Sequence, residues 1–432
     1  MRDLLLPFSM NTSPPSIVVL WDESHLWGML LLRALNASGL DFEILSARDV
    51  ARGALKSPAR QLLLVPGGWA RLKGTALGGR GREAVRAFLH QGGTYLGFCG
   101  GAGLALTAGE TGPLLNLCPW DRKPMRDRLP NFSGHVRSMT RTRPDGPETV
   151  RSLPVWWPSQ FAPRTGDNVR VLATYLEPDK DFWSADLPLA SMDETGLQDW
   201  ETVYGINLQP KKITGDPCIV TGKIGEGRYI LSYAHLETPD SPEANLFFLD
   251  LLREILPCEQ LPKKICVPAW DLAREPVIWD DPHLAAIRNS LEELIAHGRD
   301  HFLFSRRLPW LLGWRRGIPG SAVNFLHVMT VQAQAMPPSR NTAIHWETCK
   351  EELCGQMRDF TARTKPYLVR ERQVMATRVS TPEASSCPDL QKEKELLFGK
   401  FPGYGGLYGE LLRGLDQVLW TQFTGRKPFS GS

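Results

Sequence analysis

The sequence predicts an α/β protein: a mostly parallel sheet with helices on both faces, followed by an all-helical C-terminal extension. Short apolar runs that suit buried parallel strands alternate with helical patterns through the first hundred residues. Past a proline-punctuated segment at 262–282, strand signals nearly disappear and helical patterns follow one another. A length of 432 residues also favours two units, each large enough for its own core.

The first hundred residues have the order of repeated strand-helix units. A run at 17–21, rich in β-branched residues, is the first expected strand, and a helix over 25–38 follows, which Gly39 ends. The next expected elements are strands at 42–45 and 61–65 and helices at 47–53 and 81–91, and then a short strand that ends at Cys99. Strands joined in this way by helices form a parallel sheet.

The middle of the chain is expected to hold more irregular β-structure. Residues 107–165 lack clear periodicity, with short strands expected at 134–137 and 154–157. A strand at 169–175 follows, and residues 217–233 are expected to form a hairpin that turns at 225–227. An apolar helix is expected at 246–255.

The last part of the chain is expected to contain helices at 284–298, 321–335, 343–363, 366–379 and 404–423, with a break at 380–388. The domain prediction is therefore a flexible arm at 1–16, an α/β domain at 17–258 and a helical region of unknown role at 259–432. A basic and aromatic run at 305–316 is interpreted as a solvated helix face with tryptophan anchors. The alternative is a docking surface for a membrane or another protein.

Composition restricts the classes of function. Hydrophobic residues at 42%, charged residues at 22% and a net charge of +3 argue against global disorder and give no case for nucleic-acid binding. Eight scattered cysteines show neither a disulfide framework nor zinc-site spacing, which favours a reducing compartment. The early residues lack a secretory signal core, and no apolar run is long enough for a transmembrane segment. We therefore expect a cytoplasmic protein. The thiol chemistry considered below needs no metal or organic cofactor.

The stretch from Gly92 to Leu106 predicts a nucleophile elbow at Cys99. In a sharp turn from strand to helix the nucleophile has strained backbone, so its neighbours must be small, and Gly97, Gly100 and Gly101 meet that need. A helix N-terminus behind the sulfur favours the thiolate. The competing interpretation is a buried structural cysteine at a tight turn.

A second motif, His235-Leu-Glu237, follows the expected hairpin. Residues two apart share one face of an extended segment, so both side chains can point at a site above the sheet. The Glu237 carboxylate would hold the His235 imidazole in one tautomer while the imidazole draws the proton from a thiol. A single histidine at a strand end is otherwise more often structural.

Three segments together resemble the class I glutamine amidotransferase-like superfamily, and most closely its biotin-protein ligase N-terminal domain family. They are Tyr95-Leu-Gly-Phe-Cys99-Gly-Gly-Ala-Gly103, the Val65-Pro-Gly-Gly68 loop, and the Gly-Glu-Gly-Arg hairpin that leads into Ser232-Tyr-Ala-His-Leu-Glu237. The resemblance covers residues 17–256. It implies a flavodoxin-like fold with a Cys-His-Glu triad.

In that triad Cys99 is the nucleophile, His235 the base and Glu237 its orienter, and the backbone N–H groups of Gly68 and Gly100 form the oxyanion hole. The chain departs from the family where His-Leu-Glu replaces the usual His-Pro-Glu, and where Trp156-Trp157-Pro158 stands in a segment that is glycine-rich in the family. It has no ligase domain, so biotin ligation is not expected.

The leading hypothesis is a thiol-dependent hydrolase or amidotransferase-like enzyme that acts on a small-molecule or other amide-type carbonyl. A second hypothesis is a catalytically silent binding or regulatory module, with the helical region available to a protein partner. A third is a redox-responsive protein of the superfamily's redox-chaperone branch, in which an acid after the first strand lies beside the thiol. Glu23, or its neighbour Asp22, occupies that place.

Overall fold

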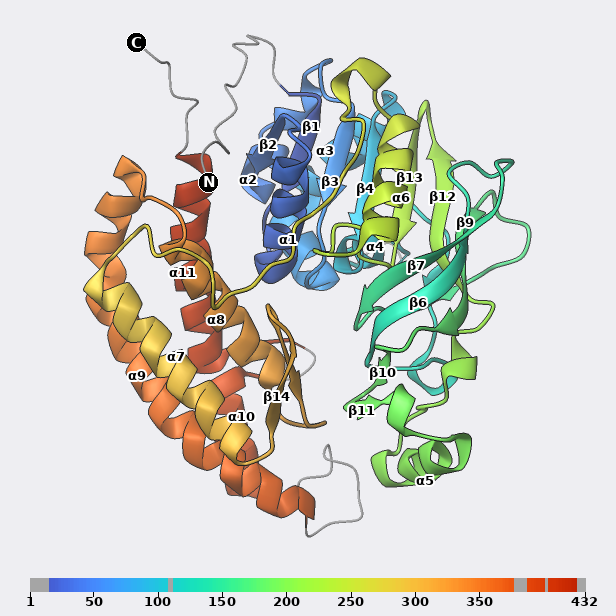
Figure 1. Ribbon diagram of the computed structural model, residues 1–432. Helices are drawn as coiled ribbons and strands as arrows, with labels where there is room; N and C mark the ends of the chain where they lie inside the picture. Colours follow the sequence, from blue (N-terminus) through green and yellow to red (C-terminus); the bar gives the residue numbers. More distant parts are fainter. Residues whose placement is uncertain (1–14, 108–111, 377–386, 401–402, 426–432) are drawn as a thin grey trace.

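The computed structural model describes residues 15–107, 112–376, 387–400 and 403–425. The expected N-terminal arm therefore lies almost entirely outside the described residues. The described chain is built around one eleven-stranded mixed sheet, flanked by helices and joined to a mainly helical C-terminal region (Figure 1).

Five strands form the parallel half of the sheet, in the spatial order β2-β1-β3-β4-β13. Four of them come from the apolar runs of the first hundred residues, and the fifth is the second strand of the expected hairpin. Their bounds are β1 Ile17–Leu20, β2 Phe42–Leu45, β3 Leu62–Val65, β4 Thr94–Phe98 and β13 Gly227–Ser232. The expected strands are confirmed to within one or two residues at each end.

The sheet continues beyond β13 with antiparallel strands. β12 (Pro217–Ile224) pairs with β13, then β9 (Arg170–Pro178), β6 (Phe132–Thr140) and β7 (Thr149–Trp156) follow by antiparallel pairing. β6 and β7 are longer than the short strands expected at 134–137 and 154–157. β10 Trp183–Ser184 and β11 Leu187–Pro188 extend the sheet beside β6. β5 Asp121–Arg122 and β8 Phe161–Ala162 pair in a separate two-stranded sheet, and the helix α5 spans Glu194–Tyr204.

Helices cover both faces of the parallel strands. Alternate residues of β1 show this: Ile17 and Val19 belong to one core cluster, and Val18 and Leu20 to another. The first cluster includes α1 (His25–Ala37) and α6 (Pro242–Arg253), and the second includes α2 (Ala47–Ala51), α3 (Ala70–His90) and α4 (Gly100–Ala105). α3 begins eleven residues before the helix expected at 81–91, because Gly78, at φ 60°, kinks it without ending it.

The C-terminal region contains α7 (Pro282–Asp300), α8 (Gly320–Gln334), α9 (Arg340–Ala376), α10 (Pro388–Phe398) and α11 (Gly406–Thr424). Figure 1 shows these helices grouped to the left of and below the parallel strands, next to α1. α9 is a single helix that runs through Pro366, where the sequence predicts two helices. Most of the break expected at 380–388 lies outside the described residues.

The expectation that this region is all-helical needs one correction. Its basic and aromatic run forms a hairpin of two strands, β14 (Phe304–Leu308) and β15 (Leu311–Trp314), and not a helix face. Pro309 and Gly313 disfavour a helix in this short run, whereas a two-stranded hairpin accommodates both. Trp310 is only 3% exposed, so its expected role as an anchor in the core is confirmed.

The α/β part and the C-terminal region share a hydrophobic core. One cluster of buried residues includes side chains of α1 and α6 together with those of α8 and α11. The two tryptophan pairs of the sequence meet in it: Trp156 lies 5.4 Å from Trp310, and Trp157 stacks on Trp314 with 4.7 Å between ring centroids. Both pairs therefore serve in packing between the two parts of the chain. The boundary proposed at residue 258 stays a prediction.

No helix among the described residues is long and apolar enough to cross a membrane.

Candidate functional site

All the site residues expected from the sequence lie at the carboxyl ends of parallel strands. Cys99 follows β4, Gly68 follows β3, Glu23 follows β1, and the His235-Leu-Glu237 motif follows β13. The order β2-β1-β3-β4-β13 places the reversal of strand order between β1 and β3, although all five strands run parallel. In open α/β sheets ligands bind at this edge, beside such a reversal.

Cys99 occupies the turn between β4 and α4 with a backbone that non-glycine residues rarely adopt. Its φ is 45° and its ψ is −102°. The Cys99 N–H donates to the Ser232 carbonyl at 2.7 Å, and the Cys99 carbonyl accepts from Gly103 N–H at 2.9 Å. The surrounding backbone thus holds the strained residue in place, as strained residues at functional sites require. The cysteine is partly exposed.

The residues around Cys99 approach one another too closely for side chains. A Cβ on Gly100 would lie 1.9 Å from the Gly68 carbonyl oxygen, and a Cβ on Gly101 would lie 2.0 Å from the Val65 carbonyl oxygen. Gly68 itself has a φ of 116°. The loop after β3 therefore packs directly against the start of α4, which brings Gly68 and Gly100 together beside the cysteine.

His235 and Glu237 form a buried pair. His235 Nδ1 lies 2.7 Å from Glu237 Oε1, and both side chains have no exposed surface. The backbone N–H of His235 donates to the Pro154 carbonyl at 2.8 Å. The side-chain amide of Asn245 donates to the Leu236 and Thr238 carbonyls at 2.9 and 3.0 Å. β7 and α6 therefore fix the loop, and Nε2 is the ring nitrogen left without a hydrogen bond.

The pKa of His235 is raised from 6.5 to about 10. Burial of the ring lowers this pKa, but the charge of Glu237 and the interaction with the Cys99 thiol outweigh burial. Cys99 and His235, which are 136 residues apart in sequence (235 − 99), are therefore near enough in the folded chain for the thiol to raise the pKa of the ring. No conventional hydrogen bond joins them, and bonds of this kind often tighten only when substrate binds.

Aromatic side chains pack against the histidine from the α1 side. The ring centroid of Trp27 lies 4.7 Å from that of His235. Trp27 also lies 6.4 Å from the ring centroid of Trp157 and 5.9 Å from that of Phe325 in α8. This packing leaves no room for a side chain at Gly67, where a Cβ would lie 2.9 Å from Trp27 and 3.1 Å from His235. The C-terminal region thus contributes, through Phe325, to the packing behind the histidine.

Glu23 lies at the same edge of the sheet, but its carboxylate has other partners. It accepts a hydrogen bond from Tyr404 and lies 3.5 Å from His25 Nε2. These contacts, together with Lys73, hold the pKa of Glu23 below its usual value against the effect of burial. The Glu23 carboxylate thus contacts His25 of α1 and Tyr404 of the C-terminal region, and neither contact involves the thiol.

Three residues of this neighbourhood are absent from the sequence-based site: His25, Lys73 and Asp416. His25 Nδ1 lies 3.3 Å from Asp416 Oδ1, and Lys73 Nζ donates to the Ser24 hydroxyl at 2.6 Å. A signal for His25 existed in the acidic, polar run 22–25 that directly follows a buried strand. No local pattern marks Lys73 or Asp416, whose partners are distant in sequence.

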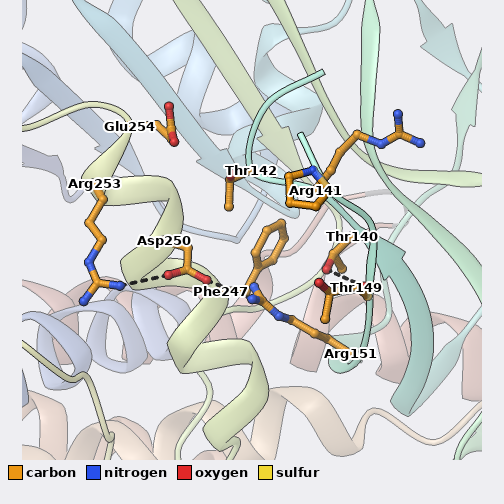
Figure 2. Close-up of a pocket in the computed structure, with 10 residues that line it drawn as sticks. Thr140, Arg141, Thr142, Thr149, Arg151, Phe247, Asp250, Arg253 and Glu254 are labelled. Atoms are coloured by element: carbon orange, nitrogen blue, oxygen red, sulfur yellow. Dashed lines mark hydrogen bonds and ion pairs between the residues drawn. The ribbon is translucent and has the colours of Figure 1, made fainter. Parts of the chain in front are cut away.

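A separate cavity of about 260 Å³ lies between the β6–β7 pair and α6 (Figure 2). Asp250 there pairs with Arg151 at 2.9 Å and with Arg253 at 3.0 Å, and Arg151 lies over the ring of Phe247. None of the residues expected at the site lines this cavity. In the part of the chain that the structure describes, no group of three or more His, Cys, Asp or Glu side chains is arranged to hold a metal ion.

The sheet order and the position of the site define the class of the first part of the chain: a doubly wound α/β protein with the flavodoxin-like strand order 2-1-3-4-5, extended by antiparallel strands. No protein-family model matches the sequence, and no curated protein matches it.

Solved structures do resemble the chain at low similarity. PurLQS from Thermotoga maritima has 13% identity and a TM-score of 0.38, covering 56% of this chain and 99% of its own. A glutamine amidotransferase has 18% identity and a TM-score of 0.33, covering 55% and 98%. A β-galactosidase from Bacillus circulans sp. alkalophilus has 13% identity and a TM-score of 0.32, covering 57% and 31%. Similarity of this degree assigns the chain to none of these families.

Proposed function

We propose that the protein is a thiol-dependent hydrolase or amidotransferase-like enzyme that acts on an amide-type carbonyl. The Cys99 sulfur forms a bond to the carbonyl carbon, and the carbonyl oxygen takes up the electron pair as an oxyanion. His235 gives its proton to the leaving amine as the C–N bond breaks. Water, or an amine acceptor, then attacks the thioester and gives a proton to His235. The C–S bond breaks, the acyl group leaves, and Cys99 returns to the thiolate.

The observation that carries this proposal is the combination of a strained cysteine with a buried His-Glu pair at one edge of the sheet. Cys99 has a φ of 45°, His235 Nδ1 lies within hydrogen-bond distance of Glu237 at 2.7 Å, and the Cys99 thiol helps to raise the pKa of the ring. The raised pKa keeps the ring protonated at neutral pH, and a positive charge beside a thiol favours the thiolate. A merely structural cysteine needs none of these features.

Two backbone N–H groups are proposed to receive the oxyanion, those of Gly68 and Gly100. Their supporting observation is the close contact between these two residues, which leaves no room for a side chain on Gly100. Backbone donors that are fixed before the reaction stabilise the developing charge without reorganisation. The finer resemblance to the biotin-protein ligase N-terminal domain family remains part of this proposal, as do the amide substrate and a protein partner for the helical region.

A binding module without catalysis remains the alternative. The redox-responsive alternative gains no support from Glu23, because the contacts of its carboxylate are with His25 and Tyr404.

The test is selective labelling of the full-length protein with a chloromethyl ketone, followed by peptide mass spectrometry. We expect Cys99 to react at least about 10-fold faster than the exposed Cys258 and Cys266, and the variant His235→Asn to lose this preference. His345→Asn, which changes a histidine outside the site, serves as the matched control and should keep it. Equal labelling of Cys99 and the exposed cysteines would overturn the proposal.

A further inference from the structure

The turn between β1 and α1, residues 22–25, lies directly against Gly68. The Glu23 carbonyl oxygen is so near that a Cβ on Gly68 would lie 1.9 Å from it. On the other side, the Gly68 carbonyl lies against the Gly100 backbone. Gly68 is therefore enclosed between this turn and the residue that follows Cys99, and any displacement of the turn must displace Gly68 as well.

The backbone of this turn is unfavourable by itself. Glu23 has a φ of 57° and His25 a φ of 46°, both in the left-handed region. Such residues persist only where their surroundings hold them. Part of that support comes from Lys73 of α3, whose fully buried Nζ donates to the Asp22 carbonyl at 2.7 Å and to the Ser24 hydroxyl at 2.6 Å.

The rest of the support comes from the C-terminal region. The Tyr404 hydroxyl donates to the Glu23 carboxylate, and Asp416 of α11 lies 3.3 Å from Nδ1 of the buried His25. Burial lowers the pKa of His25, but Asp416 and Glu23 outweigh it and raise the pKa to about 9. A charged imidazole thus stands between two carboxylates, one from each part of the chain.

We propose that Tyr404 and Asp416 are positioning residues that, through the turn at 22–25, fix the backbone N–H of Gly68 for the oxyanion. The inference rests on the proposed function. It makes the C-terminal region a part of the site.

Two reactions of Cys99 separate this role from general structural support. Butyraldehyde adds to the thiol to give a hemithioacetal: the S–C bond forms, and the carbonyl oxygen passes through an oxyanion before it takes the thiol proton. Iodoacetamide alkylates the same sulfur by displacement of iodide at a saturated carbon, with loss of the thiol proton to water, and forms no oxyanion. An oxyanion hole therefore assists the first reaction only.

The experiment measures how well butyraldehyde protects Cys99 of the full-length protein from iodoacetamide. We expect Tyr404→Phe and Asp416→Asn to weaken the protection constant about 10-fold while the iodoacetamide rate without aldehyde stays within about 2-fold. Glu410→Gln alters an exposed residue of α11, the helix that carries Asp416, and should leave both values unchanged. Thermal unfolding verifies that each variant is folded.

Two results would overturn the inference. One is an unchanged protection constant in both Tyr404→Phe and Asp416→Asn; the other is an equal fall in protection and in iodoacetamide rate, which marks general loss of structure. Failure of the proposed function looks different. In that case wild-type Cys99 is not protected by butyraldehyde at all, and this inference fails with it.

Discussion

His235 Nδ1 and Glu237 Oε1 lie 2.7 Å apart, with both side chains completely buried. A buried carboxylate is stabilised by a charged partner, which here is the His235 imidazole. Because Nδ1 contacts Glu237, Nε2 is the ring nitrogen left for a second partner. The pair therefore ties the charge of Glu237 to the protonation of His235.

Replacing Glu237 by Gln keeps the shape of the side chain and removes its charge. The pKa of His235 should then fall, because the Glu237 charge is the main effect that raises it. We expect the rate of iodoacetamide reaction at Cys99 near neutral pH to fall by about 10²-fold. The exposed Glu226 provides a matched control, since Glu226→Gln should leave the rate unchanged. An unaltered rate in Glu237→Gln would separate the carboxylate from the chemistry of the thiol.

The ion pairs of His25 should make stability fall as pH rises. The folded-state pKa is about 9, against an ordinary value near 6.5. Below about pH 6.5 both folded and unfolded states hold the proton and the stabilisation is complete. Between about 6.5 and 9 only the folded state holds it, so up to about 3 kcal/mol is lost across this range.

Urea unfolding at pH 6 and pH 9.5 measures this effect as the difference between wild type and His25→Asn. Asn tolerates the left-handed backbone of this position, so the variant removes the charge without adding strain. Lys73, whose pKa burial lowers to about 7, acts in the opposite direction in both proteins and cancels in the comparison. A difference in unfolding free energy that does not vary with pH would contradict the prediction.

Trp27 should contribute strongly to stability through its packing between His235 and Phe325. It is 6% exposed, so truncation to Ala leaves a large cavity and should lower the unfolding free energy by about 3–5 kcal/mol. Trp200 is 37% exposed, and Trp200→Ala should change the unfolding free energy by less than about 0.5 kcal/mol. Chemical denaturation of both variants decides whether the site and the C-terminal region depend on this ring.

Gly101 should not accept a methyl group. Its Cβ would lie 2.0 Å from the Val65 carbonyl, so Gly101→Ala must push β3 and α4 apart, at a cost of about 1–3 kcal/mol or more. Gly79 lies in α3 with nothing within 4 Å of its Cβ position, so Gly79→Ala should be neutral or stabilising by up to about 1 kcal/mol. Comparable melting temperatures for the two variants would contradict this account of the elbow.

The parallel part of the fold could be predicted because its strands are fully buried. Runs such as 17–21 and 61–65 carry apolar residues on both faces, and the helices between them have clear periodicity. The beginning of α3 was missed because its glycines lower helix propensity, and tertiary packing compensates for them. The hairpin at 304–314 was missed because its apolar residues are compatible with a short helix until Trp310 and Trp314 find their partners in Trp156 and Trp157.

The site could be predicted only where its residues have local signatures. Cys99 lies among glycines, and His235 and Glu237 are two residues apart, so both motifs are visible in sequence. The 2.7 Å contact between His235 and Glu237 supports the proposal, in which their catalytic roles stay a prediction. The contacts of Glu23 could not be predicted in the same way. Its partner Tyr404 is 381 residues away, and Asp416 is 391 residues from His25, separations at which no local pattern operates.

The contact between His25 and Asp416 also has a consequence for biosynthesis. The ribosome makes the β1–α1 turn early and α11 nearly four hundred residues later, and N-terminal segments generally fold first. During translation the turn beside Gly68 therefore exists for a long interval without Tyr404 and Asp416. If these residues position the oxyanion hole, the nascent chain contains Cys99 long before the oxyanion hole is fully positioned, which requires synthesis to have reached α11.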